Sequence, residues 1–353
     1  MHMAFSEPTV CGRVSEIPIN ICKKYVMKNL GLILCAIFIF FSSCDKRKIT
    51  RTDTQTSGVA TFAVDECFAP VIQEQVDVFG ALYPQALIVP QYTSENEMFN
   101  LFMKDSLRLI IAARELTPNE AQIIKDRKQT LRTQKLAIDG LALIVNKENK
   151  DTLITVSNLR KIMTGEIRSW KQLNPKSPLG DIAVTFDSPN SSTVRFVRDS
   201  ILHAGQQLGD HVRARAVDSI KTADLKDRTP NQQVIDYVAS NSNALGIIGV
   251  NWISNPSDST KLSFINNINV MSVSREEVAT IENSFKPFAA YLVLKKYPLT
   301  RDIYIIISDV REGLPAGFVR FAAGEKGQRI IYKAGLYPAV VPTRLVRINQ
   351  TLD

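Results

Sequence analysis

Strand, polar loop and helix patterns alternate along this chain, and that rhythm constrains the fold more than any other feature of the sequence. Val59–Val64 is a short β-rich run that ends at a polar turn, where Pro70 favours the first turn of a helix. The same order follows at Ala86–Pro90 and at Leu107–Ala112. This alternation predicts a mostly parallel sheet with helices on both faces. In such sheets ligands bind outside the carboxyl ends of the strands, where these polar loops lie.

Composition excludes several classes of function. The length of 353 residues allows about two domains, and the hydrophobic fraction of 45% is enough for a packed core. The formal net charge of +8 suits nucleic acid, a membrane surface or an anionic ligand. Because the basic residues are scattered and not interleaved with aromatic side chains, we expect no nucleic-acid partner. With only three histidines and no CxxC motif, we expect neither a metal site nor a cofactor.

The N-terminal region predicts that the protein is located in the bacterial cell envelope. Three lysines precede an apolar run, Leu30–Phe41, that two serines and Cys44 follow. This order is typical of a lipoprotein signal, in which Cys44 becomes the lipidated first residue of a protein that faces the periplasm. The run is short for a transmembrane helix, although an uncleaved anchor is an alternative with the same topology. Met27 would start such a signal naturally, which makes residues 1–26 a candidate over-extension of the reading frame.

Removal of the signal would also remove most of the cysteines. Cys67 is then the only thiol in the folded body, so no intramolecular disulfide can form there. The segment 45–58 is polar, rich in threonine and without hydrophobic periodicity, which predicts a tether between lipid and domain.

The segment Val184–Leu202 holds the strongest candidate site. It reads as a strand, a loop rich in hydroxyl groups and an amphipathic helix. Ser191, Ser192 and Thr193 lie at the start of that helix, beside backbone N–H groups that lack helical partners, and this combination suits a small anion. An ordinary N-cap with spare serines explains the same residues without any ligand.

Further elements extend the pattern to the end of the chain. Ser94 and Glu97 have the spacing of a capping box at the start of another helix. The remaining strands and helices are expected at Leu136–Asn146, Val156–Met163, Asn231–Ser240, Ala244–Val250, Phe288–Lys295, Phe318–Ala323 and Gly327–Lys333.

Four segments carry a family resemblance. They are Leu159–Leu173 (LRKIMTGEIRSWKQL), the triplet Ser191–Thr193, the strand Ala244–Val250, and, near the end, Gly327 and Gln328 with Gly335–Pro338. In this order they resemble the substrate-binding proteins of phosphate ABC importers, which have the type 2 periplasmic binding-protein fold. The resemblance covers about Val59 to Thr343.

The resemblance implies an α/β fold with two lobes, each a mixed, mostly parallel sheet flanked by helices, joined by two crossover strands. It divides the chain into a signal peptide at 1–43, a lipidated tether at 44–58, lobe I at 59–138 plus 289–353, and lobe II at 139–288. The crossover strands would be LAIDGLALIVN and FKPFAAYLVL. Asp139, Gly140 and Pro287 are the expected crossover points.

The family's ligand site is carried over onto three loops. The first is Asp65–Phe68, where Cys67 and Phe68 would offer mostly backbone N–H groups. The second contains Ser94, and the third is Ser191–Thr193. These hydroxyl and amide donors would surround the oxyanion.

Two charged positions depart from the family pattern. The family places an aspartate after the third strand and an arginine shortly before the hydroxyl triplet. Here Arg114 and Asp187 stand at those places, so the charges are exchanged. We expect Arg114 to contact the ligand and Asp187 to accept a proton from it. A surface pair of Arg114 with Glu115 or Glu120, and an Asx turn at Asp187, are the alternatives.

The resemblance predicts a lipid-anchored receptor that captures an oxyanion, phosphate first, and passes it to an ABC permease in the membrane. We expect a monomer that is not an enzyme. An enzyme would need a base beside its serine, and although His203 and His211 follow the loop, no G-x-S-x-G motif occurs. A sensing or interaction lipoprotein with altered or lost ligand binding is the second alternative, because carboxylates at Asp65 and Glu66 would repel phosphate.

Overall fold

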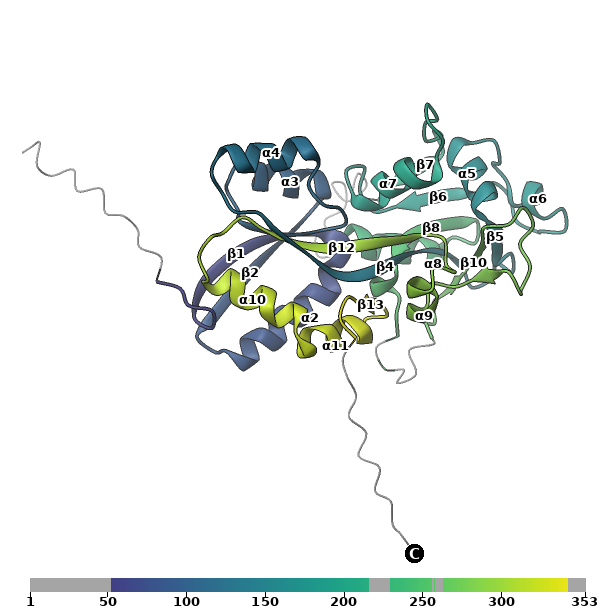
Figure 1. Cartoon of the computed structure of the whole chain (residues 1–353). Coiled ribbons are helices and arrows are strands. Elements are labelled where there is room, and N and C mark those ends of the chain that lie inside the picture. Colours follow the sequence, from purple (N-terminus) through teal and green to yellow (C-terminus); the bar gives the residue numbers. More distant parts are fainter. Residues whose placement is uncertain (1–51, 216–228, 256, 258–262, 342–353) are drawn as a thin grey trace, which may run out of the picture. The chain divides into compact units, whose positions relative to one another are not determined.

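The computed structural model describes residues 52–215, 229–255, 257 and 263–341 (Figure 1). The predicted signal peptide and Cys44 lie outside these residues. Residues 52–58 of the expected tether are described, and they lie against the chain's last helices, since Asp53 Oδ2 accepts from Leu314 N at 2.8 Å. Within the described residues no helix is long and apolar enough to cross a membrane.

The first part of the chain builds a parallel sheet around β1 (Gly58–Asp65). This strand pairs in parallel with β2 (Ala86–Thr93) on one side and with β3 (Leu109–Ala112) on the other. The connecting helices are α2 (Ala69–Leu82), α3 (Glu95–Met103) and α4 (Pro118–Asp126). The predicted strand, loop and helix rhythm is confirmed in this region.

Two long antiparallel strands connect this sheet to the rest of the molecule. The first half of β4 (Arg132–Asn146) pairs with β12 (Thr300–Ile307), and its second half pairs with β8 (Ala244–Gly249). Figure 1 shows β4 and β12 running side by side through the middle of the described structure. Because β12 also pairs with β3, it places residues from position 300 onward beside the first loops of the chain.

The predicted strand at Phe288–Lys295 is wrong. This stretch forms a short helix, α9 (Ala289–Val293), and the second crossing strand is β12. Phe288 caps the helix, because its carbonyl accepts from the Tyr291 and Leu292 backbone N–H groups at 2.8 and 3.1 Å. Short apolar runs are compatible with either a strand or a helix, so hydrophobicity alone could not separate the two.

A second parallel sheet region lies on the far side of β4. There β8 pairs with β6 (Ala183–Phe186), and β6 pairs with β7 (Val212–Ala214), so the full order is β2-β1-β3-β12-β4-β8-β6-β7. Two strands pair with β4 outside this path, β9 (Ile268–Val270) and β13 (Tyr337–Pro338). A separate small sheet contains β5 (Leu153–Thr155), β10 (Ser272–Ser274) and β11 (Ser284–Phe285).

Helices pack on both faces of this region, and two more helices follow near the end of the described chain. They are α5 (Val156–Thr164), α6 (Trp170–Leu173), α7 (Ser192–Phe196), α8 (Pro230–Ser240), α10 (Leu314–Ala323) and α11 (Glu325–Lys333). The described residues also contain the short helical segments η1 (Glu66–Phe68), the π-helical turn η2 (Val197–Ile201) and η5 (Val250–Trp252).

Apolar side chains from both parts of the sheet meet in one of the core clusters. One cluster joins Phe62 and Phe318 of the first part to Val234 and Ile248 of the second. Trp170 is fully buried in another cluster, and its Nε1 donates to the Asn243 carbonyl at 3.0 Å. Trp170 is therefore a core residue.

Candidate functional site

The first loop begins where β1 ends. Asp65 caps η1 by accepting the Cys67 backbone N–H on Oδ1 at 3.0 Å. The Cys67 carbonyl accepts from Asn251 Nδ2 and Trp252 Nε1 at 3.0 and 2.9 Å, so the turn after β8 holds this loop in place. Cys67 is fully buried with its thiol inside the molecule. The ends of β1 and β8 are thus fixed to each other.

The hydroxyl triplet follows β6 and faces the same place. Ser191 caps α7 by accepting the Val194 N–H at 3.3 Å, and its Oγ also donates to Asp187 Oδ1 at 2.6 Å. Thr193 Oγ1 donates to Asp187 Oδ2 at 3.3 Å. The Cys67 thiol reaches the same Oδ2 at 3.1 Å. Asp187 therefore sits at the centre of a buried cluster of hydroxyl and thiol donors.

An arginine that the sequence reasoning did not select completes the cluster. Arg301 Nη1 donates to Ser192 Oγ at 2.8 Å, while its Nε donates to Asp139 Oδ2 at 2.9 Å. The guanidinium carbon lies 4.9 Å from the centre of the Phe68 ring, within reach of a cation–π contact. Both side chains of the Arg301–Asp139 pair are almost completely buried, and both come from the two crossing strands β12 and β4.

Burial shifts the protonation of the groups around the cluster. Desolvation raises the pKa of Asp65, against the opposing effect of the Arg301 charge. Burial and the neighbouring Asp187 and Asp65 raise the pKa of Glu66 to about 8. Burial also raises the pKa of the Cys67 thiol, so the thiol is a neutral donor at neutral pH. Glu66 is likewise mostly protonated at neutral pH.

Some buried atoms at the site have no partner. Among the described residues, Asp65 Oδ2, Asp139 Oδ1 and Arg301 Nη2 are buried without a hydrogen bond. A buried polar atom of this kind costs stability, because it has lost its hydrogen bonds to water. An arginine nitrogen and carboxylate oxygens can together bind a group that both accepts and donates protons.

The other two predicted residues lie apart from this cluster. Arg114 binds both carboxylate oxygens of Glu120, at 2.7 and 2.9 Å, and its guanidinium carbon stacks 3.6 Å from the Phe99 ring centre. This is the surface pair that the sequence left open as the alternative. Ser94 is the N-cap of α3, but its side chain makes no capping hydrogen bond. The structure brings neither side chain into contact with Asp187.

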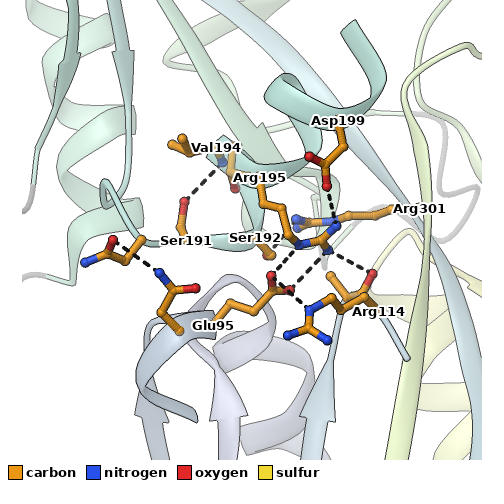
Figure 2. Close-up of polar contacts among 12 residues, drawn as sticks. Glu95, Arg114, Ser191, Ser192, Val194, Arg195, Asp199 and Arg301 are labelled. Atoms are coloured by element: carbon orange, nitrogen blue, oxygen red, sulfur yellow. Dashed lines mark hydrogen bonds and ion pairs between the residues drawn. The ribbon is translucent and has the colours of Figure 1, made fainter. Parts of the chain in front are cut away.

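A second ion-pair group links α3 to α7. Glu95, which is 1% exposed, receives Arg195 Nε on Oε1 and Arg195 Nη2 on Oε2, the latter at 3.1 Å. Arg195 Nη2 also donates to the Ala113 carbonyl at 3.3 Å, and Arg114 Nε lies 3.9 Å from Glu95 Oε1. Figure 2 shows Glu95 between the two arginines, below the Ser191 and Ser192 loop. These contacts join segments that are 100 residues apart.

Sequence reasoning missed Arg301, Asp139 as a charged partner, Glu95 and Arg195. The sequence did contain a signal for the Asp139–Arg301 pair. Asp139 interrupts an otherwise apolar strand, LAIDGLALIVN, and a buried carboxylate requires a cation. Nothing in the sequence identified that cation as Arg301. The described residues contain no group of three or more His, Cys, Asp or Glu side chains that could hold a metal ion.

Comparison with known proteins gives one family. A family model described as the PBP superfamily domain matches residues 50–326. The phosphate-binding protein PstS of Borreliella burgdorferi is 26% identical over 270 residues, which cover 76% of this chain and 85% of that protein. The PstS of a Staphylococcus aureus strain is 23% identical over 267 residues, covering 74% and 72% of the two chains.

Solved structures share the fold. The substrate-binding protein of a phosphate ABC transporter from Clostridium perfringens, solved with bound phosphate, superimposes with a TM-score of 0.64 at 18% identity. The superposition covers 80% of this chain and 100% of the Clostridium perfringens chain. A phosphate transport receptor from Vibrio cholerae gives a TM-score of 0.57 at 20% identity, covering 79% of this chain and 99% of that one. The predicted two-lobed type 2 fold and the predicted family resemblance are confirmed.

Proposed function

Because the chain belongs to the PBP superfamily, we propose that it is an extracytoplasmic solute-binding protein that captures phosphate for an ABC importer. The observation that carries this proposal is the buried cluster of Ser191, Ser192 and Thr193 with Arg301. Hydroxyl groups and one guanidinium are the donors that an oxyanion requires. The names of the relatives, phosphate-binding proteins in two other bacteria, support phosphate as the ion.

In this proposal the ligand lies between the ends of β1 and β6. Ser191, Ser192 and Thr193 contribute hydroxyl groups, and the loop at Cys67 and Phe68 contributes backbone donors. Arg301 takes the role that the sequence assigned to Arg114, because its Nη2 is buried without a partner and its Nη1 already contacts Ser192. In this proposal neither Ser94, at the start of α3, nor Arg114, after β3, contacts the ion directly.

We further propose that binding closes two lobes, 59–138 plus 289–353 and 139–288. The Glu95–Arg195 contact joins these two ranges and would hold them together over the ion. Both crossing strands carry a member of the Asp139–Arg301 pair, so a ligand that contacts Arg301 acts directly on the hinge.

The protein is proposed to be a monomeric lipoprotein, anchored through Cys44 and partnered by a membrane permease. Replacement of Cys44 by Ala should move the expressed protein from the detergent phase to the aqueous phase in a temperature-induced detergent partition. Replacement of Cys35 by Ala, inside the apolar run of the predicted signal, serves as the control and should change nothing. A Cys44→Ala protein that stays in the detergent phase refutes the lipid anchor.

The contacts of Ser191 also fit a binding protein better than they fit an enzyme. Ser191 donates to a carboxylate, Asp187, and not to a histidine, so the serine–histidine pair of a hydrolase is not formed at Ser191. The alternative of an oxyanion sensor or interaction protein with altered ligand binding keeps one supporting observation. Two buried carboxylates, Asp65 and Asp187, lie in the cluster where an anion would bind.

Isothermal titration with phosphate and with sulfate tests the proposal. We expect heat from phosphate at micromolar to millimolar concentration, and at least a tenfold loss of affinity in Thr193→Val. Ser106→Ala, which removes an exposed hydroxyl group outside the site, is the matched control. Absence of heat from either ion, with folded protein, would leave the interaction lipoprotein as the better account.

A further inference from the structure

The carboxylate of Asp187 occupies the position where the hydroxyl donors converge. Its Oδ1 accepts from Ser191 Oγ at 2.6 Å, and its Oδ2 accepts from Thr193 Oγ1 at 3.3 Å and from the Cys67 thiol at 3.1 Å. All four side chains are at most 2% exposed. Three donors from two separate loops thus meet on one internal anion.

These donors cannot serve two acceptors at once. A serine or threonine hydroxyl has a single hydrogen to donate, and a thiol likewise has one. As long as Ser191 and Thr193 donate to Asp187, they have no hydrogen for a bound oxyanion. A carboxylate also resembles part of an oxyanion, because both present negatively charged oxygens to the same donors.

The charges around the cluster also disfavour a bound oxyanion. Arg301 reaches the cluster through Ser192, but Asp139 already receives its Nε. Asp65 is fully buried beside Cys67, whose backbone it binds. Adding a phosphate next to Asp65 and Asp187 brings like charges together in a buried site, which disfavours binding.

We infer that Asp187 is an internal competitor for the oxyanion and the residue that sets affinity at this site. The inference rests on the proposed function and deepens it, since it says how the same site is regulated by its own side chain. A ligand binds only when the Asp187 carboxylate gives up Ser191 and Thr193. Removing the carboxylate therefore strengthens oxyanion binding. A carboxylate that accepts the ligand's proton instead would have the opposite effect when removed.

Titration calorimetry with inorganic phosphate on the full-length protein separates these cases. We expect Asp187→Asn and Asp187→Ser each to bind phosphate at least tenfold more tightly than the wild type. Two variants are used because Asn keeps the size of the side chain, whereas Ser leaves space for the ligand. Asp126→Asn removes one negative charge from an exposed position on α4 and should leave the affinity unchanged.

The outcomes distinguish this inference from the function that it rests on. Tighter binding of phosphate by both variants, together with measurable but weaker binding by the wild type, supports both. A wild type that binds phosphate more tightly than both folded variants overturns the inference and leaves the function standing. Equal affinity in all proteins also overturns the inference. No heat from the wild type or from either variant overturns both.

Discussion

Replacement of Arg301 by Met should destabilise the protein strongly, because it leaves the Asp139 carboxylate buried without its cation. The Arg301 side chain is 3% exposed and that of Asp139 is fully buried, with 2.9 Å between Nε and Oδ2. Removing one partner of a buried pair costs about 3–5 kcal/mol, mainly the penalty of leaving the other charge unpaired. We expect a loss of that size in the free energy of unfolding.

A matched control lies on the same two strands. Lys135 of β4 pairs with Asp302 of β12 at 2.7 Å, but both side chains are more than a third exposed. Water and salt screen such a pair, so Lys135→Met should cost only about 0–1 kcal/mol. Both ion pairs join the same two strands at similar distances, 2.9 and 2.7 Å, and they differ in burial.

Urea unfolding followed by tryptophan fluorescence measures the difference. Trp170 and Trp252 are the two tryptophans of the chain, and Trp252 donates to the Cys67 carbonyl beside the site. The double variant Asp139→Asn with Arg301→Met removes both charges and should be more stable than Arg301→Met alone. The reasoning is refuted if Arg301→Met loses less than about 1 kcal/mol, or if the double variant is no more stable than the single one.

Three further predictions concern pH, the α3–α7 contact and two glycines. The pKa of Glu66, raised to about 8, means that the folded protein binds more protons than the unfolded chain between pH 4.5 and 8, so stability falls as the pH rises through that window. Glu66→Gln should reduce the slope of the unfolding free energy against pH by up to about 1.4 kcal/mol per pH unit, measured by urea unfolding at pH 5 to 8. An unchanged slope would contradict the raised pKa of Glu66. Glu95→Gln should destabilise by about 2–3 kcal/mol, because a buried charged acceptor for Arg195 is lost; an unchanged urea midpoint would show that the contact is not formed in solution. Gly165→Ala should lower stability by about 1 kcal/mol, since this C-cap has φ +88°, whereas Gly80→Ala inside α2, with open space around it, should raise stability by about 0.5–1 kcal/mol. Thermal unfolding of the two glycine variants checks the opposite signs.

Local elements were the most predictable part of this protein. β1, α2, β2 and α8 lie within a few residues of their expected positions, because each rests on hydrophobic period and capping within a short window. The hydroxyl triplet was identified for the same reason, since Ser191 at a helix start is a local pattern. The strand expected at Phe288–Lys295 failed because its run of seven apolar residues fits either a strand or a helix.

The sequence by itself determined the alternation of strands and helices and the candidate site loop at Ser191–Thr193. Only the tertiary structure decided that Asp139 is a charged partner and that its cation is Arg301. Arg301 follows Asp139 by 162 positions, and the antiparallel pairing of β12 with β4 places them opposite each other. The same holds for Glu95 and Arg195, which are 100 positions apart and form an ion pair only in the folded chain. Charged side chains select partners by distance in space, and distance between remote segments is fixed by the packing of the whole fold.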